Sequence, residues 1–275
     1  MSLTRTQRFG ISSIAGISLL TILAAPAMAQ DAPPTVTMSA GIDVVNQYMF
    51  RGIRQNGTGV ATWPFFDLGI GAFEGDGPLK TVGINVGTWN SAHSKPSGWY
   101  ESDVYATVGL GLGGGVGLAT TYTSYTSPND SFTHVKEVAL KASFDDSTAL
   151  GSAAMKPYAL VAFELATEPG RYQADGGLKG GRYLELGVAP GISGGRASLA
   201  LPIKVGLSAG NYYELDGVDN KFGFFSVGGL VTVPFASHFN VHGGLEFQAL
   251  GDTTKALNGG DGSQVIGSFG IGLSY

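Results

Sequence analysis

The stretch that decides the fold is residues 103–112, which read DVYATVGLGL. Every second residue from Val104 to Leu112 is apolar, and the residues between them are polar or small. Successive side chains of a β-strand point to opposite faces, so this spacing places the apolar residues on one face of a sheet. The same alternation recurs at Thr81–Trp89 and, as the longest run, at Ala197–Ala209.

About twelve segments of this kind follow one another along the chain. They span residues 35–50, 61–73, 79–91, 99–112, 114–126, 134–145, 155–166, 181–192, 196–213, 220–235, 239–251 and 264–275. Alternation of apolar and polar residues over segments of about ten residues is typical of transmembrane barrels, whose strands must close because lipid offers no hydrogen bonds to an open edge. We therefore predict an all-β fold, a transmembrane antiparallel up-and-down β-barrel of about twelve strands.

The composition agrees with a barrel and excludes several other classes. Glycine accounts for 44 of 275 residues, while charged residues are only 13%. The chain has no cysteine, which excludes a disulfide scaffold, a cysteine-ligated metal site and a cysteine nucleophile. The net charge of −5 gives no electrostatic basis for binding nucleic acid.

The N-terminus has the three-part layout of a secretory signal peptide. Arg5 and Arg8 precede an apolar run from Ile11 to Ala25, and Ala27-Met28-Ala29 supplies a small-x-small cleavage site. We expect residues 1–29 to be removed before Gln30, which leaves residues 30–275 as one barrel domain. Export combined with a membrane barrel predicts the bacterial outer membrane.

Connection lengths and aromatic residues suggest an orientation. Short turns of such barrels face the periplasm and long loops face the exterior, and the predicted long loops include Arg51–Gly59 and Ala92–Gly98. The connection from Asp145 to Ala154 departs from this rule, since it is long on the short side. Aromatic residues near strand ends suit interfacial girdles. These are Tyr48, Phe50, Trp63, Trp89, Trp99, Tyr122, Tyr125, Tyr212, Tyr213 and Phe235.

Two stretches resemble known families. The chain ends at Tyr275 with Leu273, Ile271 and Phe269 at alternate positions before it, which resembles the C-terminal signature that the barrel-assembly machinery reads in outer-membrane proteins. Residues 42–55 resemble the opening of the TorF-like porin family of Gram-negative bacteria. The family pattern Tyr-x-Phe-Arg-Gly-Ile-x-Gln falls on Tyr48, Phe50, Arg51, Gly52, Ile53 and Gln55, where strand one would reach the rim. This resemblance implies a pore.

Charged residues on the inner face are the candidate functional residues. Charges on the lipid face cost about 2–4 kcal/mol for Lys or Arg at mid-depth, so the charged residues of the strands should face inward. The predicted pore-lining residues are Asp43, Asp67, Asp103, Glu137, Lys141, Glu164, Glu185, Lys204 and Glu246. Arg51 would lie near the outer rim with Asp67 as its partner, and inner glycines such as Gly83, Gly87, Gly109, Gly111 and Gly206 would leave space.

The residues point to a channel more than to an enzyme. The four histidines lack metal-ligand spacing, and no Ser–His pair with an orienting polar partner is recognisable. We therefore predict no enzyme activity, no catalytic or metal site and no cofactor. The expected function is a narrow porin-like channel for ions or small hydrophilic solutes with a mild cation preference. Expected partners are outer-membrane lipid and the barrel-assembly machinery. A non-conducting structural or adhesive barrel stays open as an alternative, and a barrel hydrolase is less favoured.

Overall fold

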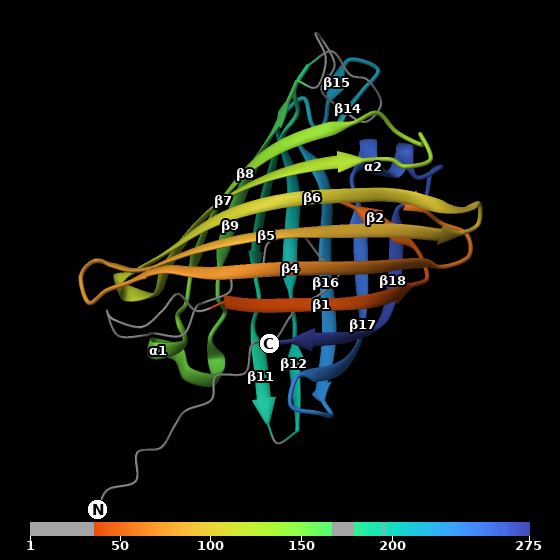
Figure 1. Ribbon diagram of the computed structural model, residues 1–275. Helices are drawn as coiled ribbons and strands as arrows, with labels where there is room; N and C mark the ends of the chain where they lie inside the picture. Colours follow the sequence, from red (N-terminus) through yellow and green to blue (C-terminus); the bar gives the residue numbers. More distant parts are fainter. Residues whose placement is uncertain (1–35, 167–178, 195) are drawn as a thin grey trace, which may run out of the picture.

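The computed structural model describes residues 36–166, 179–194 and 196–275, and its architecture is a twelve-stranded antiparallel barrel (Figure 1). Its strands are β1 (Val36–Val45), β4 (Ala61–Glu74), β5 (Leu79–Ser94), β6 (Ser97–Leu112), β7 (Val116–Thr126), β8 (Val135–Phe144), β9 (Tyr158–Leu165), β10 (Arg182–Val188), β13 (Ile203–Gly210), β16 (Phe222–Pro234), β17 (Phe239–Leu250) and β18 (Ser263–Ser274). Each strand pairs with the next, and β18 pairs with β1 from Ser39↔Ser274 to Val45↔Ser268, so the barrel is closed. The predicted fold is confirmed. The signal peptide that the sequence predicts lies outside the described residues.

Two barrel strands are interrupted at prolines. β11 (Gly191–Gly194) continues the course of β10 beyond Pro190, and β12 (Ala197–Ala200) precedes β13 across Pro202. Because proline has no N–H to donate to a ladder, regular pairing stops there. β11 and β12 form a hairpin, and β12 pairs with β16 at Ser198↔Thr232, so this hairpin still belongs to the barrel sheet.

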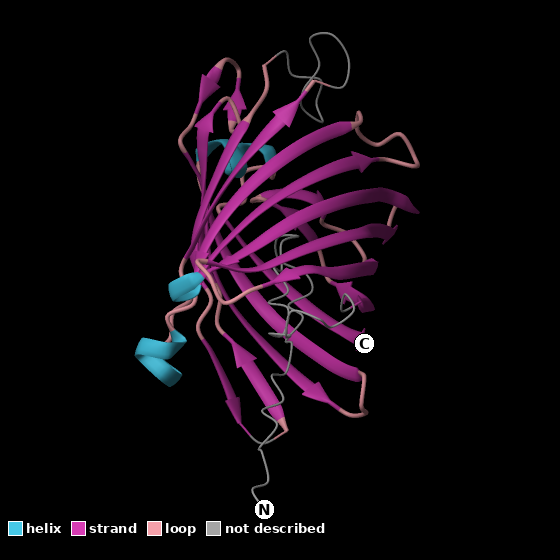
Figure 2. Ribbon diagram, turned by 60° about the vertical axis from the view of Figure 1, so that its left-hand side comes forward, coloured by secondary structure: helices cyan, strands magenta, loops and turns pink. Residues whose placement is uncertain are grey.

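One of the remaining elements is a short hairpin that folds into the barrel, formed by β2 (Tyr48–Phe50) and β3 (Ile53–Asn56). The other elements lie at the barrel ends. A second small hairpin is β14 (Glu214–Leu215) and β15 (Val218–Asp219). Figure 2 shows the helices α1 (Ser147–Leu150) and α2 (Asp252–Leu257) at opposite ends, and two 3₁₀ turns, η1 (Gly113–Gly115) and η2 (Gly151–Ala153), complete the chain. No helix within 36–166, 179–194 and 196–275 is long and apolar enough to cross a membrane.

One predicted loop is wrong. The sequence suggested a loop over Ala92–Gly98, but β5 runs to Ser94 and β6 starts at Ser97. Ser94↔Ser97 and His93↔Gly98 are still paired, so backbone hydrogen bonding continues almost to the turn. Polar residues at the end of a strand therefore misled the assignment, because a strand that extends beyond the bilayer can carry them without cost.

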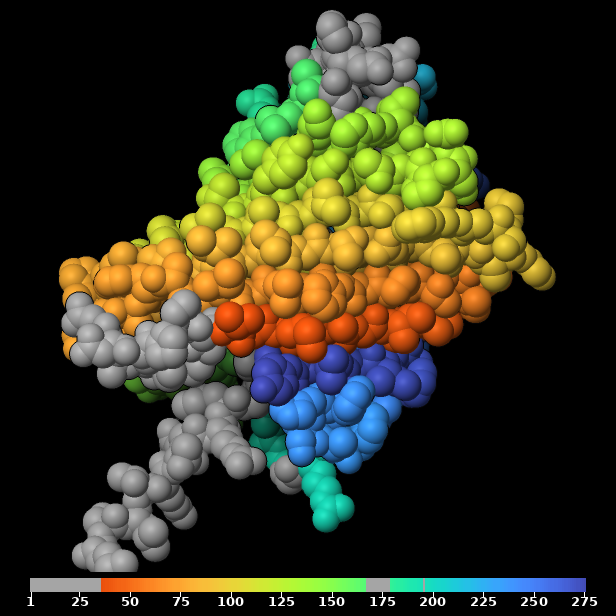
Figure 3. Space-filling model, viewed as in Figure 1, coloured from red at the N-terminus to blue at the C-terminus, as the bar shows by residue number. Residues whose placement is uncertain are grey.

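The outer surface of the strands is apolar. Ile84 and Val86 of β5 are 41% and 49% exposed, whereas Asp103 on the inner face of β6 is 2% exposed. Figure 3 shows this outer surface as a continuous face, closed where β1 meets the C-terminal strands. An exposed apolar band around a closed barrel is what a hydrocarbon environment requires, so the fold and exterior are those of a bacterial outer-membrane protein. The C-terminal residues Phe269, Ile271 and Tyr275 also face outward.

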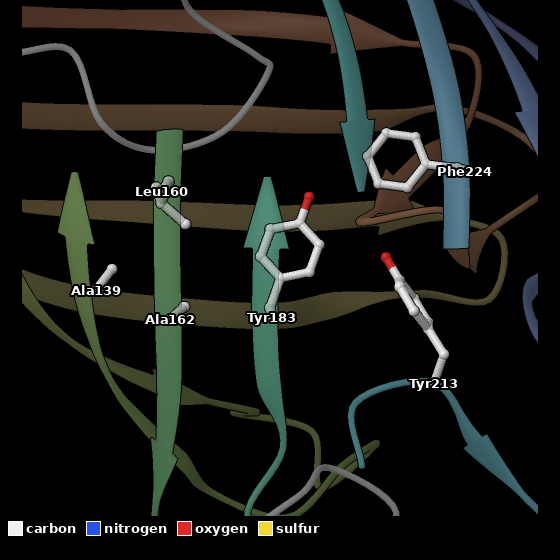
Figure 4. Close-up of a cluster of buried hydrophobic side chains, with 6 residues drawn as sticks. All are labelled: Ala139, Leu160, Ala162, Tyr183, Tyr213 and Phe224. Carbon is white, nitrogen blue, oxygen red and sulfur yellow. The ribbon is translucent and has the colours of Figure 1, made fainter. Parts of the chain in front are cut away.

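The interior holds aromatic rings that the sequence placed at the membrane interfaces. Tyr48, Trp63 and Tyr213 are at most 5% exposed and lie inside the barrel. The girdle assignment is wrong for these three and for Phe50, Trp89, Tyr125 and Tyr212, whose side chains also contact inner residues. Trp99, Tyr122 and Phe235 are exposed. Figure 4 shows one inner cluster, in which the rings of Tyr183, Tyr213 and Phe224 converge from three elements beside Ala139, Leu160 and Ala162.

Candidate functional site: the barrel lumen

The β2–β3 hairpin folds into the lumen. Phe50 pairs with Ile53, and the two residues between them, Arg51 and Gly52, have φ of 49° and 80°. Positive φ at both central residues is the geometry of the type I′ turn, which suits a two-residue hairpin. The first loop, expected at the rim, is therefore a compact element inside the barrel.

Hydrogen bonds from the far end of the chain hold this hairpin. Asn258, which follows α2, donates from Nδ2 to the carbonyl of Gly52 (2.8 Å) and accepts from the backbone N–H of Arg54 (2.7 Å). The hydroxyl of Tyr213 donates to the carbonyl of Arg51 (2.8 Å). Asn258 and Tyr213 are at most 1% exposed. The hairpin is thus pinned by buried polar contacts more than 150 residues away in sequence.

The Arg51 guanidinium is the central ionic contact of the lumen. It donates to both carboxylate oxygens of Glu137 on β8, with N···O distances of 2.6 and 2.8 Å. It also lies 4.2 Å from the ring centroid of Tyr183 and hydrogen-bonds to the Tyr212 hydroxyl (3.1 Å). The predicted partner Asp67 is wrong; Asp67 instead accepts from the Asn85 side chain (2.9 Å). The motif Tyr48, Phe50, Arg51 and Gly52 consequently belongs to the lumen and not to the rim.

The nine residues predicted to line a pore all lie on the inner side of their strands. Asp43, Asp103, Glu137, Glu185, Lys204 and Glu246 are nearly inaccessible, and Asp67, Lys141 and Glu164 are partly exposed. Several have close partners. Glu185 accepts from the hydroxyls of Tyr158 (2.8 Å) and Tyr183 (2.6 Å), and Lys204 lies 4.0 Å from Glu246. Whether these side chains line a conducting path stays a prediction.

A buried carboxylate–imidazole pair crosses strand β18. Asp43 on β1 and His242 on β17 both register with Gly270, and Asp43 Oδ1 lies 2.6 Å from His242 Nε2. Asn240 Oδ1 lies 3.0 Å from the other ring nitrogen of His242. A Cβ on Gly270 would lie between the two side chains, so only glycine at this position lets them meet. Nothing in the sequence pairs residues 199 positions apart, and this contact was missed.

Inner glycines accommodate aromatic rings from the neighbouring strand. Gly206 registers with Phe224 and Gly87 with Tyr105, and in both cases the ring occupies the place of the missing side chain. A Cβ on Gly187 would likewise lie 2.6 Å from the Tyr158 ring. The expectation that Gly87 and Gly206 leave space is therefore wrong, because rings fill it. Gly83 has no such neighbour.

Sequence reasoning also missed Glu101. It lies two residues before Asp103, so strand periodicity puts both on the inner face, and Glu101 is 5% exposed. The signal was available, because residue 101 lies within the predicted strand 99–112 and shares the face of Asp103. Glu101 raises the inner carboxylates to eight, against Lys141, Lys204 and Arg51.

Two serine–histidine contacts lie in the part of the chain that the structure describes. Ser124 of β7 lies 2.7 Å from His134, which directly precedes β8, and Ser91 lies 3.1 Å from His93 inside the barrel. Among the described residues, neither imidazole has a carboxylate or amide hydrogen-bonded to its second nitrogen. His242 has both polar partners but no hydrogen-bonded serine. No complete nucleophile–base–orienter arrangement is therefore present in the part of the chain that the structure describes. Within the same residues, no three His, Asp or Glu side chains are grouped to hold a metal ion.

The chain resembles known proteins in sequence over less than half its length and in fold over most of it. Residues 29–145 match a family described as "Bacterial protein of unknown function (Gcw_chp)". No curated protein matches.

Three solved structures illustrate the fold. The COG4313 outer membrane channel from Pseudomonas putida F1 matches with TM-score 0.51 and 12% identity over 91% of this chain and 100% of that chain. The translocator domain of autotransporter NalP from Neisseria meningitidis gives 0.45 and 13% over 89% and 90%. The Salmonella typhi outer membrane phospholipase OMPLA gives 0.44 and 12% over 86% and 90%. At 12% identity the likeness to the Pseudomonas putida channel shows the outer-membrane barrel fold alone. The TorF-like family that the sequence suggested is not among these matches.

Proposed function

We propose that the protein is a narrow outer-membrane channel for small hydrophilic solutes or ions, with a preference for cations. The observation that carries this proposal is the charge of the inner face, where eight carboxylates of the described strands stand against Lys141, Lys204 and Arg51. A passage with low-dielectric walls focuses such a field and enriches ions of opposite sign. The C-terminal strand, ending at Tyr275, would be the element that the barrel-assembly machinery recognises.

The hairpin in the lumen favours a second candidate, a non-conducting structural barrel. Arg51, Tyr48 and Phe50 occupy space that a wide pore would leave to water. A twelve-stranded barrel lies between eight-stranded barrels, which side chains fill, and sixteen-stranded ones, which hold an aqueous channel. Single-channel measurements separate the two candidates directly.

The test is conductance of the refolded mature protein in planar bilayers under a salt gradient. A channel with this inner charge gives a reversal potential of the cation-selective sign, and the preference shrinks as salt rises, because the Debye length falls from about 30 Å at 0.01 M to about 10 Å at 0.1 M. Lys204→Gln should increase cation selectivity, because it removes one of the three inner bases. Lys80→Gln, at an exposed strand end, is the matched control and should change little. An anion-selective potential would overturn the proposal, and a silent bilayer would favour the structural barrel.

A further inference from the structure

Lys136 is a charged residue on the outer face of the barrel. Its neighbour Glu137 points into the lumen, where it binds Arg51, so alternation along β8 turns Lys136 outward. Within residues 36–166, 179–194 and 196–275, no carboxylate forms an ion pair with Lys136. A lysine on the lipid face is costly at mid-depth and nearly free of cost at the membrane boundary, and Lys136 is the second residue of its strand. It therefore carries an uncompensated positive charge at the level of the lipid headgroups.

Two further polar side chains lie beside Lys136. Ser124 on β7 registers directly with Lys136, so the two side chains are neighbours on the same outward face. Ser124 Oγ lies 2.7 Å from Nε2 of His134, which directly precedes β8. Burial and the positive charge of Lys136 lower the pKa of the His134 imidazole, so the two basic groups are close enough to repel each other. Lys136, His134 and Ser124 thus form one group of side chains, the Lys136 cluster, at the edge of the membrane.

The Lys136 cluster offers hydrogen-bond donors that lack acceptors. The Lys136 ammonium has three N–H groups, and Nδ1 of His134 has no hydrogen-bond partner among the described residues. His134 is exposed and Lys136 is partly exposed, so a ligand reaches both from outside the barrel, on the face that β7 and β8 turn outward in Figure 3. A phosphate group has several acceptor oxygens on one centre and a negative charge, so it can accept from both bases and offset their repulsion.

The outer surface next to the Lys136 cluster, toward the middle of the barrel, is apolar. The outward residues that follow Lys136 on β8 are Val138 and Leu140, and Tyr122 on β7 registers with Val138. Leu140 and Tyr122 are 44% and 39% exposed. A tyrosine in this position is typical of the headgroup level, and the aliphatic residues beyond it suit an acyl chain. The cluster and this strip together match a ligand with an anionic group at one end and a hydrocarbon chain at the other.

From this geometry we infer a binding site for the phosphate group of an anionic membrane lipid on the outer face of the barrel, formed by Lys136, His134 and Ser124. The Lys136 ammonium and the His134 imidazole donate to phosphate oxygens, and Ser124 fixes the imidazole from its other side. One acyl chain of the lipid runs along Val138 and Leu140. Free phosphate would make no contact with this apolar strip, so the ligand is the lipid. The site concerns the outside of the barrel and does not depend on whether the lumen conducts.

The experiment counts bound lipids by native mass spectrometry of the refolded mature protein in an uncharged detergent. The protein is titrated with dimyristoyl phosphatidic acid and, separately, with dimyristoyl phosphatidylcholine, which has the same chains but a choline cation beside its phosphate. We expect saturable binding of one phosphatidic acid per protein, about tenfold tighter than phosphatidylcholine, because a charged hydrogen bond is worth about that factor. Inorganic phosphate at the concentration of the lipid should not displace the phosphatidic acid.

Lys136→Gln is the decisive variant, since it removes the charge and keeps a long polar side chain. It should weaken the binding of phosphatidic acid about tenfold or more and leave phosphatidylcholine unchanged. His134→Ala should weaken it about threefold, because it removes one uncharged donor. Lys95→Gln, an equal charge change in the exposed turn between β5 and β6, is the matched control and should bind as the wild type does.

Three results would overturn the site. Equal affinity for the two lipids would show that the cluster does not select an anionic phosphate. An equal loss of affinity in Lys136→Gln and Lys95→Gln would show a general effect of net charge. Displacement of phosphatidic acid by inorganic phosphate at the same concentration would show a site for the free ion in place of the lipid. The mobility difference between boiled and unboiled samples confirms that each variant is folded.

Discussion

Replacing Arg51 with alanine should destabilise the barrel by about 3–5 kcal/mol, the usual cost of removing one partner of a buried ion pair. The Arg51 and Glu137 side chains are only 11% and 5% exposed, and two short N–H···O bonds join them. Without the guanidinium, Glu137 stays buried, with the Tyr125 hydroxyl at 3.4 Å as its remaining donor. The penalty therefore comes mainly from the unpaired carboxylate.

The backbone of Arg51 provides an internal check on this reasoning. Its φ of 49° lies in the left-handed region, which costs an L-residue other than glycine, asparagine or aspartate about 1–2 kcal/mol. Strain of this kind persists where a side chain is needed, and here that side chain makes the ion pair. Arg51→Asn should consequently lose less stability than Arg51→Ala by about 1 kcal/mol, because asparagine tolerates the turn while losing the same charge.

The assay is denaturant unfolding in detergent, followed by tryptophan fluorescence and by the mobility difference between boiled and unboiled samples. A double-mutant cycle of Arg51→Ala with Glu137→Gln should give a coupling of about 2–3 kcal/mol, at the upper end for residues in contact. Lys221→Ala is the control, since its pair with Asp219 is exposed and should contribute less than about 1 kcal/mol. If Arg51→Ala stays within about 0.5 kcal/mol of the wild type, the ion pair does not hold the hairpin and the argument fails.

Two further predictions concern other parts of the barrel. Gly270→Ala should lower the free energy of unfolding by about 3 kcal/mol or more, because the new methyl group separates the buried imidazole–carboxylate pair that crosses β18. Gly267→Ala is the control: its Cβ meets only a leucine methyl at 3.6 Å, so it should change the unfolding midpoint little. Equal effects of the two substitutions would contradict this prediction. Asp146, in the β8–β9 connection, accepts from the backbone N–H groups of Lys156 (2.9 Å) and Met155 (3.1 Å), which hold the pKa of its carboxyl below the ordinary value. Its contribution is therefore complete above the ordinary aspartate pKa of about 3.9 and is lost as pH falls through the lower folded pKa. The difference in stability between wild type and Asp146→Ala should therefore shrink as pH falls below about 4. A gap that does not change with pH would show that the carboxylate charge is not involved.

Strand periodicity was enough to predict the barrel and the inner side of the nine charged residues assigned to the lumen. A lipid-facing charge is costly, so the position of a single residue such as Asp103 fixes the facing of its whole strand. The same rule places the Trp63 ring inside, because Trp63 shares the inner face of β4 with Asp67. Trp63 was assigned to the interface because an aromatic residue near a strand end is also typical of an interfacial girdle. Periodicity would not have placed Tyr48 inside, because Tyr48 belongs to the lumen hairpin.

The lumen hairpin could not be predicted in the same way. The sequence of residues 48–56 predicts the end of a strand followed by a loop, and nothing in it marks a second short strand that returns from the turn at Arg51-Gly52. What turns the hairpin inward is the ion pair with Glu137, 86 residues away, and the hydrogen bonds to Asn258, more than 200 residues away. Such partners leave no local pattern, because each is one polar residue among many on an inner face.

The inner glycines connect packing with function. Gly87, Gly187 and Gly206 each receive a ring from the adjacent strand, so the high glycine content narrows the lumen by admitting aromatic side chains. In the proposed channel, the hairpin and these rings limit the width of the path. A change that loosens the Arg51–Glu137 contact should therefore lower the free energy of unfolding and, under this proposal, widen the path at the same time. If the free energy of unfolding and the conductance varied independently among such variants, the path would have to lie on the opposite side of the lumen, away from β8.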